Sequence, residues 1–446
     1  MVDKIINTLA FLALLFLIFL GGFAVSFFKA GPYEMMHTGF SAMKIAYKIQ
    51  HANLNESFFV WPEPNNYIGQ SGVTVYDADK AYDGYTLYSP SSEQAAYLLD
   101  MKGEVVHSWA MPFSKAWKIP PHIDSPVKDN KIIWRGLHLF PNGDLLAVYN
   151  AVETTPYGYG VVKIDKDSNI IWRYPGFAHH DISVGEDGRV YILTNKVTED
   201  VVAGAPHLNP PLFDEYVSIL SPDGQLEKSI SIYDAFANSE YFSEVVEYFT
   251  QTQRADISTS NAEYGDIIHP NTVTYIGAEE AEKQPLFQQG QILISLREHD
   301  ILAVLDPQTE TIIWAARGFW RAQHSARMTK DGNIVLFDND GPQTTPRKSR
   351  VLEYDPVFDR IIWSYEGTAE RPFYSSVRAA VQSLPNSNVL VTSYENGRLF
   401  EVTQKGEIVW EFFTSDTLEG DPMRIAGVHS GFRFSKDELL FLNEGE

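Results

Sequence analysis

The sequence contains no cysteine, and its basic residues are few compared with its acidic ones. Without cysteine, neither a disulfide bond nor a thiolate metal site can form. The 35 Lys and Arg residues stand against 58 Asp and Glu residues, which gives a formal net charge of −23. A surface that binds nucleic acid needs clustered basic side chains, so this balance argues against a nucleic-acid partner.

Charge is also missing from one long stretch near the N-terminus. Residues 5–28, "IINTLAFLALLFLIFLGGFAVSFF", have no charged side chain and are bracketed by Lys4 and Lys29. As a helix this stretch would extend roughly 36 Å, enough to cross a hydrocarbon core of about 30 Å. We therefore predict a transmembrane anchor over 1–29 that is not cleaved. A cleaved signal peptide is the alternative, although it would have a shorter apolar core and a small-residue cleavage site.

What the rest of the chain has in abundance is repetition. An apolar strand, a polar turn with Asp or Gly and a second apolar strand recur, and five of the six copies end in Trp. The copies are 98–109, 163–172, 219–230, 304–314, 353–363 and 401–410. A second strand–turn–strand pattern alternates with the first, at 138–150, 181–195, 271–298, 326–340, 381–394 and 432–443.

Each pattern predicts a β-hairpin from its turn residues and β-rich flanks. Two hairpins make a four-stranded sheet, and six such sheets predict an all-β, six-bladed β-propeller, because a closed ring buries both faces of every blade. We place the propeller at 71–446, after the transmembrane helix and a helical linker at 30–70. A helical insertion at 231–262 could form a lid or a contact surface. We expect the terminal Trp residues to pack between blades.

Histidines stand at the upstream ends of the predicted inner strands, which line the channel of a propeller. His180 lies eight residues before the turn glycine Gly188, and His324 lies eight residues before Gly332. The shared spacing predicts that both rings lie at the same height on the axis. His269 heads the corresponding strand of another blade, and His429 and His138 are further candidates in other registers. Any one of them alone could be a structural histidine, but three on one axis suggest a site.

Arginines indicate which chemistry those histidines would serve. Arg321 and Arg327 flank His324, and Arg297 and Arg378 lie near other predicted inner strands. Cations repel a metal ion, whereas guanidinium groups match the oxygens of a tetrahedral oxyanion such as sulfate or phosphate. The pattern therefore favours oxyanion chemistry with no metal and no cofactor.

These residues resemble the bacterial arylsulfotransferases that work without a nucleotide sulfate donor. The resemblance rests on "HHDI", on "DIIHPNTV" followed by "ILISLRE", and above all on "QHSARMTKDGNIVLFDND". It covers most of residues 95–443. It implies a six-bladed propeller with its active site at the channel. It also implies transfer of a sulfuryl group from a phenolic sulfate ester to a phenol through a sulfated histidine.

Carried onto this sequence, the resemblance makes His324 the nucleophile. It implies that His269 and Arg297 hold the sulfuryl oxygens and that His180 is the remaining active-site histidine, with His179 as its competitor. The further candidates for binding the substrate are Arg321, Arg327, Arg378, His179, Asn339 and His429.

The expected partners are an aryl sulfate donor and a hydroxyl acceptor, which could be a phenol or a glycan. With the predicted anchor, we expect a single-pass protein of the bacterial inner membrane whose propeller faces the periplasm.

Two other functions stay open from the sequence alone. Motifs such as "VLDPQTETIIWA" look like the tryptophan-docking repeats of quinoprotein dehydrogenases. A non-catalytic, membrane-anchored propeller that binds a partner or a polysaccharide is the other alternative, because a fold does not by itself imply an activity.

Overall fold

The structure is a computed structural model that describes residues 59–60, 67–152, 154, 156–200, 211–251, 266–341, 347–419 and 421–442, together with Phe16 and Leu20. The predicted transmembrane anchor and most of the predicted linker at 30–70 lie outside the described residues. Within the described residues, no helix is long and apolar enough to cross a membrane. The chain divides into two units, Met1–Glu56 and Ser57–Glu446, and the fold below is that of the second.

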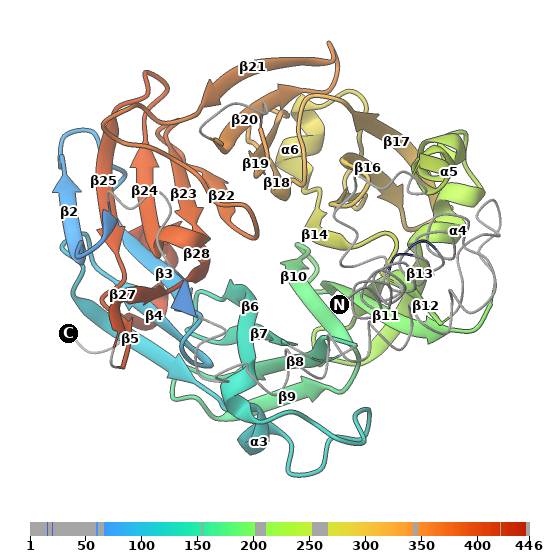
Figure 1. Cartoon of the computed structure of the whole chain (residues 1–446), viewed down its shortest axis with the longest axis horizontal. Helices are drawn as coiled ribbons and strands as arrows, with labels where there is room; N and C mark the ends of the chain where they lie inside the picture. Colours follow the sequence, from blue (N-terminus) through green and yellow to red (C-terminus); the bar gives the residue numbers. More distant parts are fainter. Residues whose placement is uncertain are drawn as a thin grey trace, which may run out of the picture. The chain divides into compact units, whose positions relative to one another are not determined.

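The described strands of Ser57–Glu446 form six antiparallel blades around a central axis, which confirms the prediction of an all-β, six-bladed propeller (Figure 1). From the axis outward, the first three blades are β28 (Val428–Phe434), β3 (Tyr85–Pro90), β4 (Ala95–Leu99) and β5 (Val105–Ala110); β6 (Ile132–Leu139), β7 (Leu145–Ala151), β8 (Gly158–Ile164) and β9 (Ile170–Tyr174); and β10 (Ala178–Val184), β11 (Val190–Thr198), β12 (Leu212–Leu220) and β13 (Leu226–Ser231).

The remaining three blades are β14 (Pro270–Tyr275), β15 (Ile292–Leu296), β16 (Ile301–Asp306) and β17 (Thr311–Arg317); β18 (His324–Met328), β19 (Ile334–Asp338), β20 (Arg350–Asp355) and β21 (Arg360–Tyr365); and β22 (Ala380–Ser383), β23 (Val389–Ser393), β24 (Arg398–Val402) and β25 (Ile408–Phe413). The last of these blades gains a fifth, outermost strand, β2 (Gly72–Tyr76), which pairs with β25. A small sheet of β1 (Phe59–Val60), β27 (Asp421–Ala426) and β26 (Thr417–Leu418) lies apart from the blades.

The tryptophans at the ends of the outer hairpins join neighbouring blades. The indole Nε1 of Trp172 donates to Pro222 O, that of Trp363 to Gln404 O and that of Trp410 to Met101 O, each at 3.0 Å. In every case the acceptor lies in the outer hairpin turn of the next blade. The indoles therefore pack between blades, as the sequence predicts, and they also bind the neighbouring turn.

One predicted hairpin is wrong. The segment 432–443 reads as an inner hairpin, but after β28 the chain turns into two short 3₁₀ helices, η5 (Lys436–Glu438) and η6 (Leu440–Leu442). The partner of β28 is instead β3, near the start of the propeller, with Phe434 opposite Tyr85. Leu439 and Phe441 enter the core of the first two blades, so their apolar character serves packing and not a strand.

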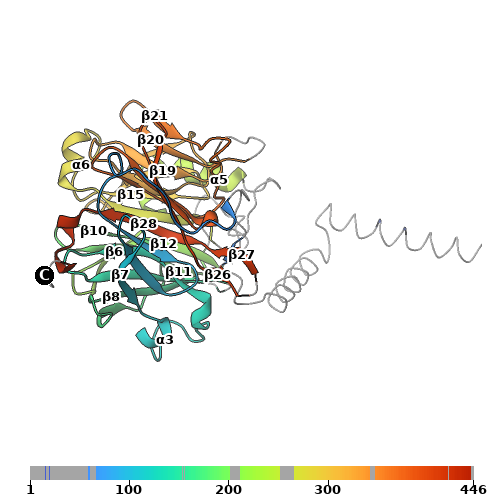
Figure 2. The same cartoon turned by 90° about the vertical axis from the view of Figure 1, so that its left-hand side faces the viewer.

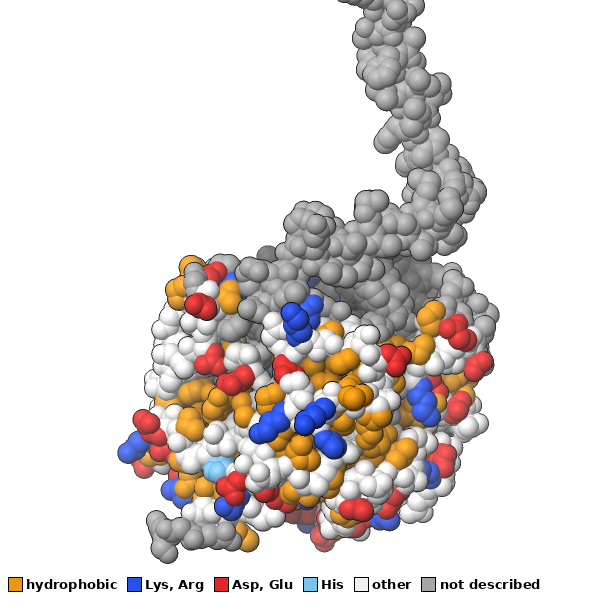
Figure 3. All heavy atoms as spheres, turned by 90° about the horizontal axis from the view of Figure 1, so that it is seen from below, with side chains coloured by type: hydrophobic (Ala, Val, Ile, Leu, Met, Phe, Trp, Pro, Cys, Tyr) orange, Lys and Arg blue, Asp and Glu red, His pale blue; other side chains and the backbone are white. Residues whose placement is uncertain are grey.

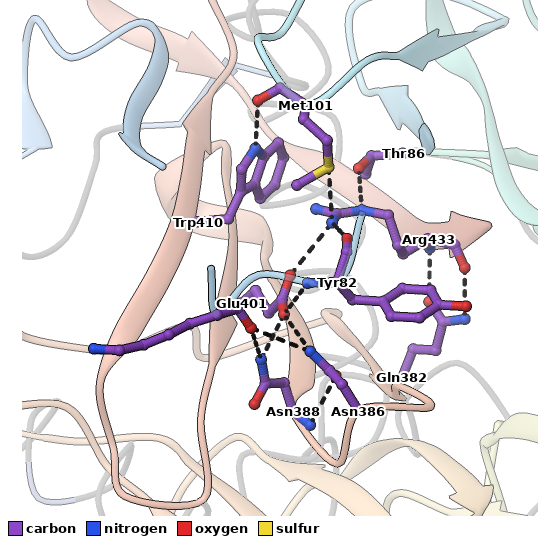
Figure 4. A network of polar contacts seen from close by, with 10 residues as sticks. Tyr82, Thr86, Met101, Gln382, Asn386, Asn388, Glu401, Trp410 and Arg433 are labelled. Carbon is purple, nitrogen blue, oxygen red and sulfur yellow. Dashed lines mark hydrogen bonds and ion pairs between the residues drawn. The ribbon is translucent and has the colours of Figure 1, made fainter. Parts of the chain in front are cut away.

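The pairing of β28 with β3 closes the ring, and a buried polar network surrounds it (Figure 4). Arg433 on β28 donates to Thr86 on β3 at 2.7 Å and lies 3.3 Å from the carboxylate of Glu401 on β24. Both side chains of this ion pair are fully buried. Asn388 and the backbone of Tyr82 also donate to Glu401, at 2.7 and 2.8 Å. One network thus ties the last strand to the first blade and to the preceding blade.

Helices are few and short in the described part of the chain. Between β13 and β14 lie α4 (Ile232–Ala237) and α5 (Phe242–Gln251), within the insertion that the sequence sets apart at 231–262. They lie at the outer edge of the ring beside β13 and β17, and Arg317 on β17 donates to the backbone of Glu244 at 2.5 Å (Figure 1). α4 and α5 lie at the outer edge of the ring and not over its centre, and residues 252–262 of the insertion lie outside the described residues, so both roles considered from the sequence stay predictions.

The other short helices are α3 (Phe113–Ala116), α6 (Ala278–Lys283), η2 (Asp129–Lys131) and η4 (Tyr394–Asn396). Seen from the side, α6 lies at one face of the ring and the hairpin of β26 and β27 lies at the other (Figure 2). On the outer surface in Figure 3, apolar, acidic and basic side chains are mixed and histidine is scarce.

Candidate active site

One residue at or just before each of the six innermost strands lies at an equivalent position in the wall of a single cavity. These residues are Arg135 from β6, His180 from β10, Asn271 from β14, His324 from β18, Ala379 just before β22, and His429 from β28. The same cavity is lined by the residues that follow several of them, including Asp181, Thr272 and Ser325. The cavity is therefore built by equivalent positions of successive blades.

A β-bulge in the inner strand accompanies most of these positions. The pairing shifts between Trp134 and Leu137 in β6, between His179 and Ile182 in β10, and between His324 and Arg327 in β18. It also shifts around Asn271 in β14 and His429 in β28. A bulge bends its strand and re-aims side chains. Here it directs a side chain toward the axis, and His180 reaches this geometry with a left-handed φ of 61°.

His324 is held in one tautomer by its surroundings. Its Nδ1 lies 2.7 Å from Oδ1 of Asn339 and 3.1 Å from the carbonyl oxygen of Ala322. The side-chain nitrogen of Asn339 donates to the carbonyl oxygens of Ser375 and Arg378, both at 2.9 Å, so its oxygen is the atom that faces His324. Because both neighbours of Nδ1 are acceptors, Nδ1 carries the proton and Nε2 keeps its lone pair.

The imidazole of His324 is also kept neutral. Burial lowers its pKa well below the ordinary value, and the positive charges of Arg135 and Arg297 lower it further. Desolvation and nearby cations both disfavour the imidazolium form. His324 is thus a buried, neutral imidazole with a lone pair on Nε2 in the wall of the cavity.

Two arginines in the cavity have no counter-ion among the residues that the structure describes. The guanidinium of Arg135 makes no hydrogen bond or ion pair with any described residue, and burial together with Arg378 lowers its pKa to about 9. It is therefore still protonated at neutral pH. The guanidinium of Arg378 lies over the ring of Tyr394, 4.3 Å from its centroid, with no carboxylate partner among the described residues. A cavity with two such cations is suited to an oxyanion.

The other predicted arginines differ in their placement. Arg327 lines the cavity but is paired with Asp181 at 2.7 Å. Arg297 lies close enough to lower the pKa of His324, yet it is paired with Glu298 and does not line the cavity. Arg321 is exposed and does not line the cavity; its backbone N–H donates to Asp338 at 2.8 Å.

The histidine pair of "HHDI" divides between the cavity and the core. His180 lines the cavity, and His179 lies behind it, with the two Nδ1 atoms 2.8 Å apart. The Nε2 of His179 is 2.9 Å from the carboxyl group of Glu215 on β12, so His179 itself does not reach the cavity. Nε2 of His180 is buried and has no partner among the described residues.

His269 lies beside this pair and not in the cavity wall. Its ring meets that of His180 edge to face with centroids 4.8 Å apart, and its Nδ1 is 2.5 Å from Asp266. Burial would raise the pKa of Asp266, but His269 and the hydroxyl of Tyr157 outweigh burial and leave the pKa lowered. Asp266 is therefore an anion that fixes the orientation of His269.

His429 completes the cavity wall. Neither of its ring nitrogens has a partner among the described residues, and its ring lies 4.9 Å from that of Tyr394. Burial and the charges of Arg378 and Arg135 lower its pKa well below the usual value, so it is neutral. His138 is not in the cavity; its ring packs edge-on against Phe140.

The residue that the sequence analysis missed is Arg135, although the signal was present. Arg135 lies eight residues before the turn glycine Gly143, the same spacing that identifies His180 and His324. His429 has this spacing too, from Asp437, which stands in "FSKD" where Gly143 stands in "FPNG". A spacing rule limited to histidines before a glycine identifies His180 and His324, misses Arg135 and places the candidate His429 in a different register.

Tyr157, Asp266 and Glu215 were also missed. They lie behind the cavity, and no local pattern in the sequence links them to it. Within the described residues, no group of His, Asp and Glu side chains is arranged to hold a metal ion.

Comparison with solved structures gives only distant similarity. The chain is similar to a protein of unknown function from Bacteroides caccae, with a TM-score of 0.45, 10% identity and coverage of 75% of this chain and 95% of that one. It is also similar to streptogramin B lyase, with a TM-score of 0.40, 12% identity and coverage of 81% and 87%. No curated protein sequence matches the chain.

A protein-family comparison is more specific. The model of the family described as "Arylsulfotransferase (ASST)" matches residues 136–415, which include His180, His324 and Asn339. This match spans more than half of the chain. The chain belongs to the arylsulfotransferase family.

Proposed function

We propose that this protein transfers a sulfuryl group from an aryl sulfate ester to a hydroxyl acceptor through a sulfohistidine at His324. The observation that carries the proposal is the neutral His324, whose Nδ1–H is bound by Asn339, in a cavity with the unpaired cations of Arg135 and Arg378. Family membership gives the reaction class, and the cavity supports the route.

In the first half-reaction the lone pair on Nε2 of His324 attacks sulfur, and the bond between sulfur and the aryl oxygen breaks. Arg135 and Arg378 stabilise the charge on the sulfuryl oxygens in the transition state. They take the role that the resemblance gives to His269 and Arg297, because those two do not line the cavity. His180 lines the cavity and its Nε2 has no partner among the described residues, so this nitrogen protonates the departing phenoxide.

In the second half-reaction the acceptor hydroxyl replaces the phenol. His180 takes its proton, the acceptor oxygen attacks sulfur, and the bond between sulfur and Nε2 breaks. Neutral His324 is regenerated with its Nδ1–H still bound to Asn339. No proton moves at Nδ1 in either step, so one fixed tautomer serves the whole cycle.

The test is a single-turnover measurement on the full chain. A chromogenic aryl sulfate without acceptor should release one equivalent of phenol in a burst, and peptide mass spectrometry should find an acid-labile sulfuryl group on His324. His324→Asn should abolish both signals.

His138→Asn is the matched control, because it changes a partly buried histidine outside the cavity and should leave the burst unchanged. A folded protein that gives no burst with several aryl sulfates would contradict the proposal and favour a propeller that only binds. Membrane anchoring through residues 1–29 and a periplasmic location remain part of the proposal, to be checked by fractionation of cells that express the full chain.

A further inference from the structure

A buried chain of three titratable side chains leads away from the cavity at His180. Nδ1 of His180 lies 2.8 Å from Nδ1 of His179, and Nε2 of His179 lies 2.9 Å from Oε2 of Glu215. The three residues are 4%, 0% and 0% exposed, so no solvent interrupts the chain. At one end His180 lines the cavity, and its remaining ring nitrogen, Nε2, has no partner among the described residues; the other end is a carboxyl group in the core.

The hydrogen bond between the two Nδ1 atoms restricts where protons can be. Exactly one of these nitrogens carries a hydrogen, because two hydrogens would collide and none would leave two lone pairs facing each other. If His179 donates, its Nε2 is bare and must accept from a protonated Glu215, and neutral His180 carries its proton on Nε2. If His180 donates, its Nε2 is bare, and Nε2–H of His179 donates to an ionised Glu215.

The first arrangement has one more proton than the second. The difference seen by the substrate is at Nε2 of His180, which carries a proton in the first arrangement and none in the second. In the first arrangement His180 is a neutral donor toward the cavity, and in the second it is a neutral acceptor. When Nε2 of His180 gives up its proton, Nδ1 of His180 receives the proton of His179, and Nε2 of His179 receives the proton of Glu215. The negative charge that results is on Glu215, and neither imidazole becomes charged.

The charges around the chain explain why such a path is needed. Burial lowers the pKa of His180 well below the ordinary value, and Arg135, His269, His179 and His324 lower it further. An imidazolium at His180 is therefore not available as the acid at neutral pH.

Glu215 and His179 can supply the proton that a neutral His180 cannot hold as an imidazolium. Burial raises the pKa of Glu215 well above its usual range, with Asp266 and Asp214 adding to the rise. Burial likewise lowers the pKa of His179 to about 3, although the charge of Asp266 opposes this shift. Glu215 can therefore hold a proton at neutral pH while both histidines stay uncharged.

We propose that Glu215 and His179 form a proton relay that lets His180 act in turn as acid and base without becoming an imidazolium. This inference rests on the proposed function, in which His180 protonates the leaving phenoxide and later deprotonates the acceptor. Neither relay residue touches the substrate, so both act through His180.

The test compares leaving groups in Glu215→Gln. The amide can donate to Nε2 of His179 and so preserves the first arrangement, but it cannot release a proton. Donors whose phenol is weakly acidic need the proton, and their burst should slow by roughly 10²–10⁴-fold, the usual range for general acid catalysis. 4-Nitrophenyl sulfate releases a stable phenolate, and its burst should change less than about threefold because it needs no acid. His179→Gln should show the same selectivity, and the double variant should be no slower than either single one.

The matched control is Glu353→Gln, which changes a partly buried carboxyl group on β20 that accepts from Asn333 and lies outside the cavity. It should leave both donors unaffected. An equal loss for all donors in Glu215→Gln and His179→Gln would overturn the relay and make both residues structural. An unmodified protein without a burst from 4-nitrophenyl sulfate would instead contradict the proposed function itself, so the two failures can be told apart.

Discussion

At the scale of single residues, the site depends on positive charges that lack partners. Several buried or partly buried cations of the described residues are neutralised: Arg327 by Asp181, Arg398 by Glu411 and Arg433 by Glu401. Arg135 has no such partner among the described residues, and its charge lowers the pKa of three histidines of the cavity. In the proposed reaction the same cation attracts the sulfate ester and keeps His324 in its neutral form.

Arg135→Gln should therefore have two effects. Loss of a charge that stabilises the transition state should lower kcat/KM for the aryl sulfate by about 10²–10³-fold, as for the loss of an oxyanion-binding donor. The pKa of His324 should also rise, because a cation that disfavoured its protonated form is gone. The neutral form is lost as pH falls through the pKa, so the acidic fall in activity should begin at a higher pH than in the unmodified protein. The pH profile of the burst rate measures this shift.

Arg321→Gln is the control for Arg135→Gln. It removes an arginine adjacent in sequence to the nucleophile's strand but exposed and outside the cavity. Its burst rate and pH profile should stay within about twofold of the unmodified protein, the range usual for a surface charge. An unchanged pH profile in Arg135→Gln would contradict the electrostatic role of Arg135.

Arg321 and Arg135 show which site residues can be predicted from the sequence and which cannot. Arg321 was predicted because it is near His324 in the sequence. The arginine that lines the same cavity as His324 is Arg135, which is far from His324 along the chain. The repeat does carry the information, since equal spacing from the turn places a residue at equal height in each blade. Side-chain partners such as Asn339 with Ser375, or His179 with Glu215, depend on contacts between strands that no spacing rule describes.

At the scale of elements, the cavity depends on how closely the inner strands approach each other. Gly136 follows Arg135 in the bulge of β6, and a Cβ at this position would lie 3.0 Å from both Cα of Asp181 and the carbonyl oxygen of His180. Only glycine leaves room for the backbone of β10 here. The backbone that carries His180 is therefore positioned by the absence of a side chain on the neighbouring strand.

Gly136→Ala should push β10 away by a few tenths of an ångström. The displacement of His180 should lower the burst rate for donors with weakly acidic phenols on the order of tenfold, since small misplacements of catalytic groups are costly. Single-turnover rates, with circular dichroism as a check on folding, measure this effect.

Gly290→Ala is the comparison for Gly136→Ala. Gly290 has a left-handed φ of 90° and no neighbour within 4 Å, so alanine there strains the backbone without touching the cavity. It should lower stability by about 1 kcal/mol and leave the burst rate unchanged. A normal rate in Gly136→Ala would show that β10 does not need this close approach.

At the scale of the whole molecule, the ring is closed by the pairing of β28 with β3 and by the ion pair of Arg433 with Glu401. Burial lowers the pKa of Arg433 to about 10, so the side chain is charged at neutral pH in spite of its surroundings. A buried ion pair that loses one partner leaves an uncompensated charge in the core.

Arg433→Met should therefore destabilise the propeller by about 3–5 kcal/mol, the usual cost of breaking a buried pair. The midpoint of thermal unfolding should fall by several degrees. Adding Glu401→Gln should recover part of this loss, because the double variant no longer buries an unpaired carboxylate. Equal and additive losses for the two changes would show that the pair contributes no coupling to ring closure.

The closure is also where prediction from sequence failed. Six repeats could be counted because each hairpin pairs residues a few positions apart, and its turn and alternation are visible locally. The partner of β28 lies more than 300 positions earlier, and "FRFSKDELLFLN" contains a strand, a turn and an apolar segment of its own. The pairing of β28 with β3, and the burial of Leu439 and Phe441 in the core, depend on contacts that exist only in the closed ring.

Because β28 follows every other blade strand in the chain, it is the last to leave the ribosome during synthesis. It brings His429 into the cavity and Arg433 into the closing network at the same time. A nascent chain that stops before β28 has five complete blades, an open edge at β3 and a cavity that lacks one wall. Closure of the ring and completion of the proposed active site are then one event, so an unfinished chain lacks one wall of that site.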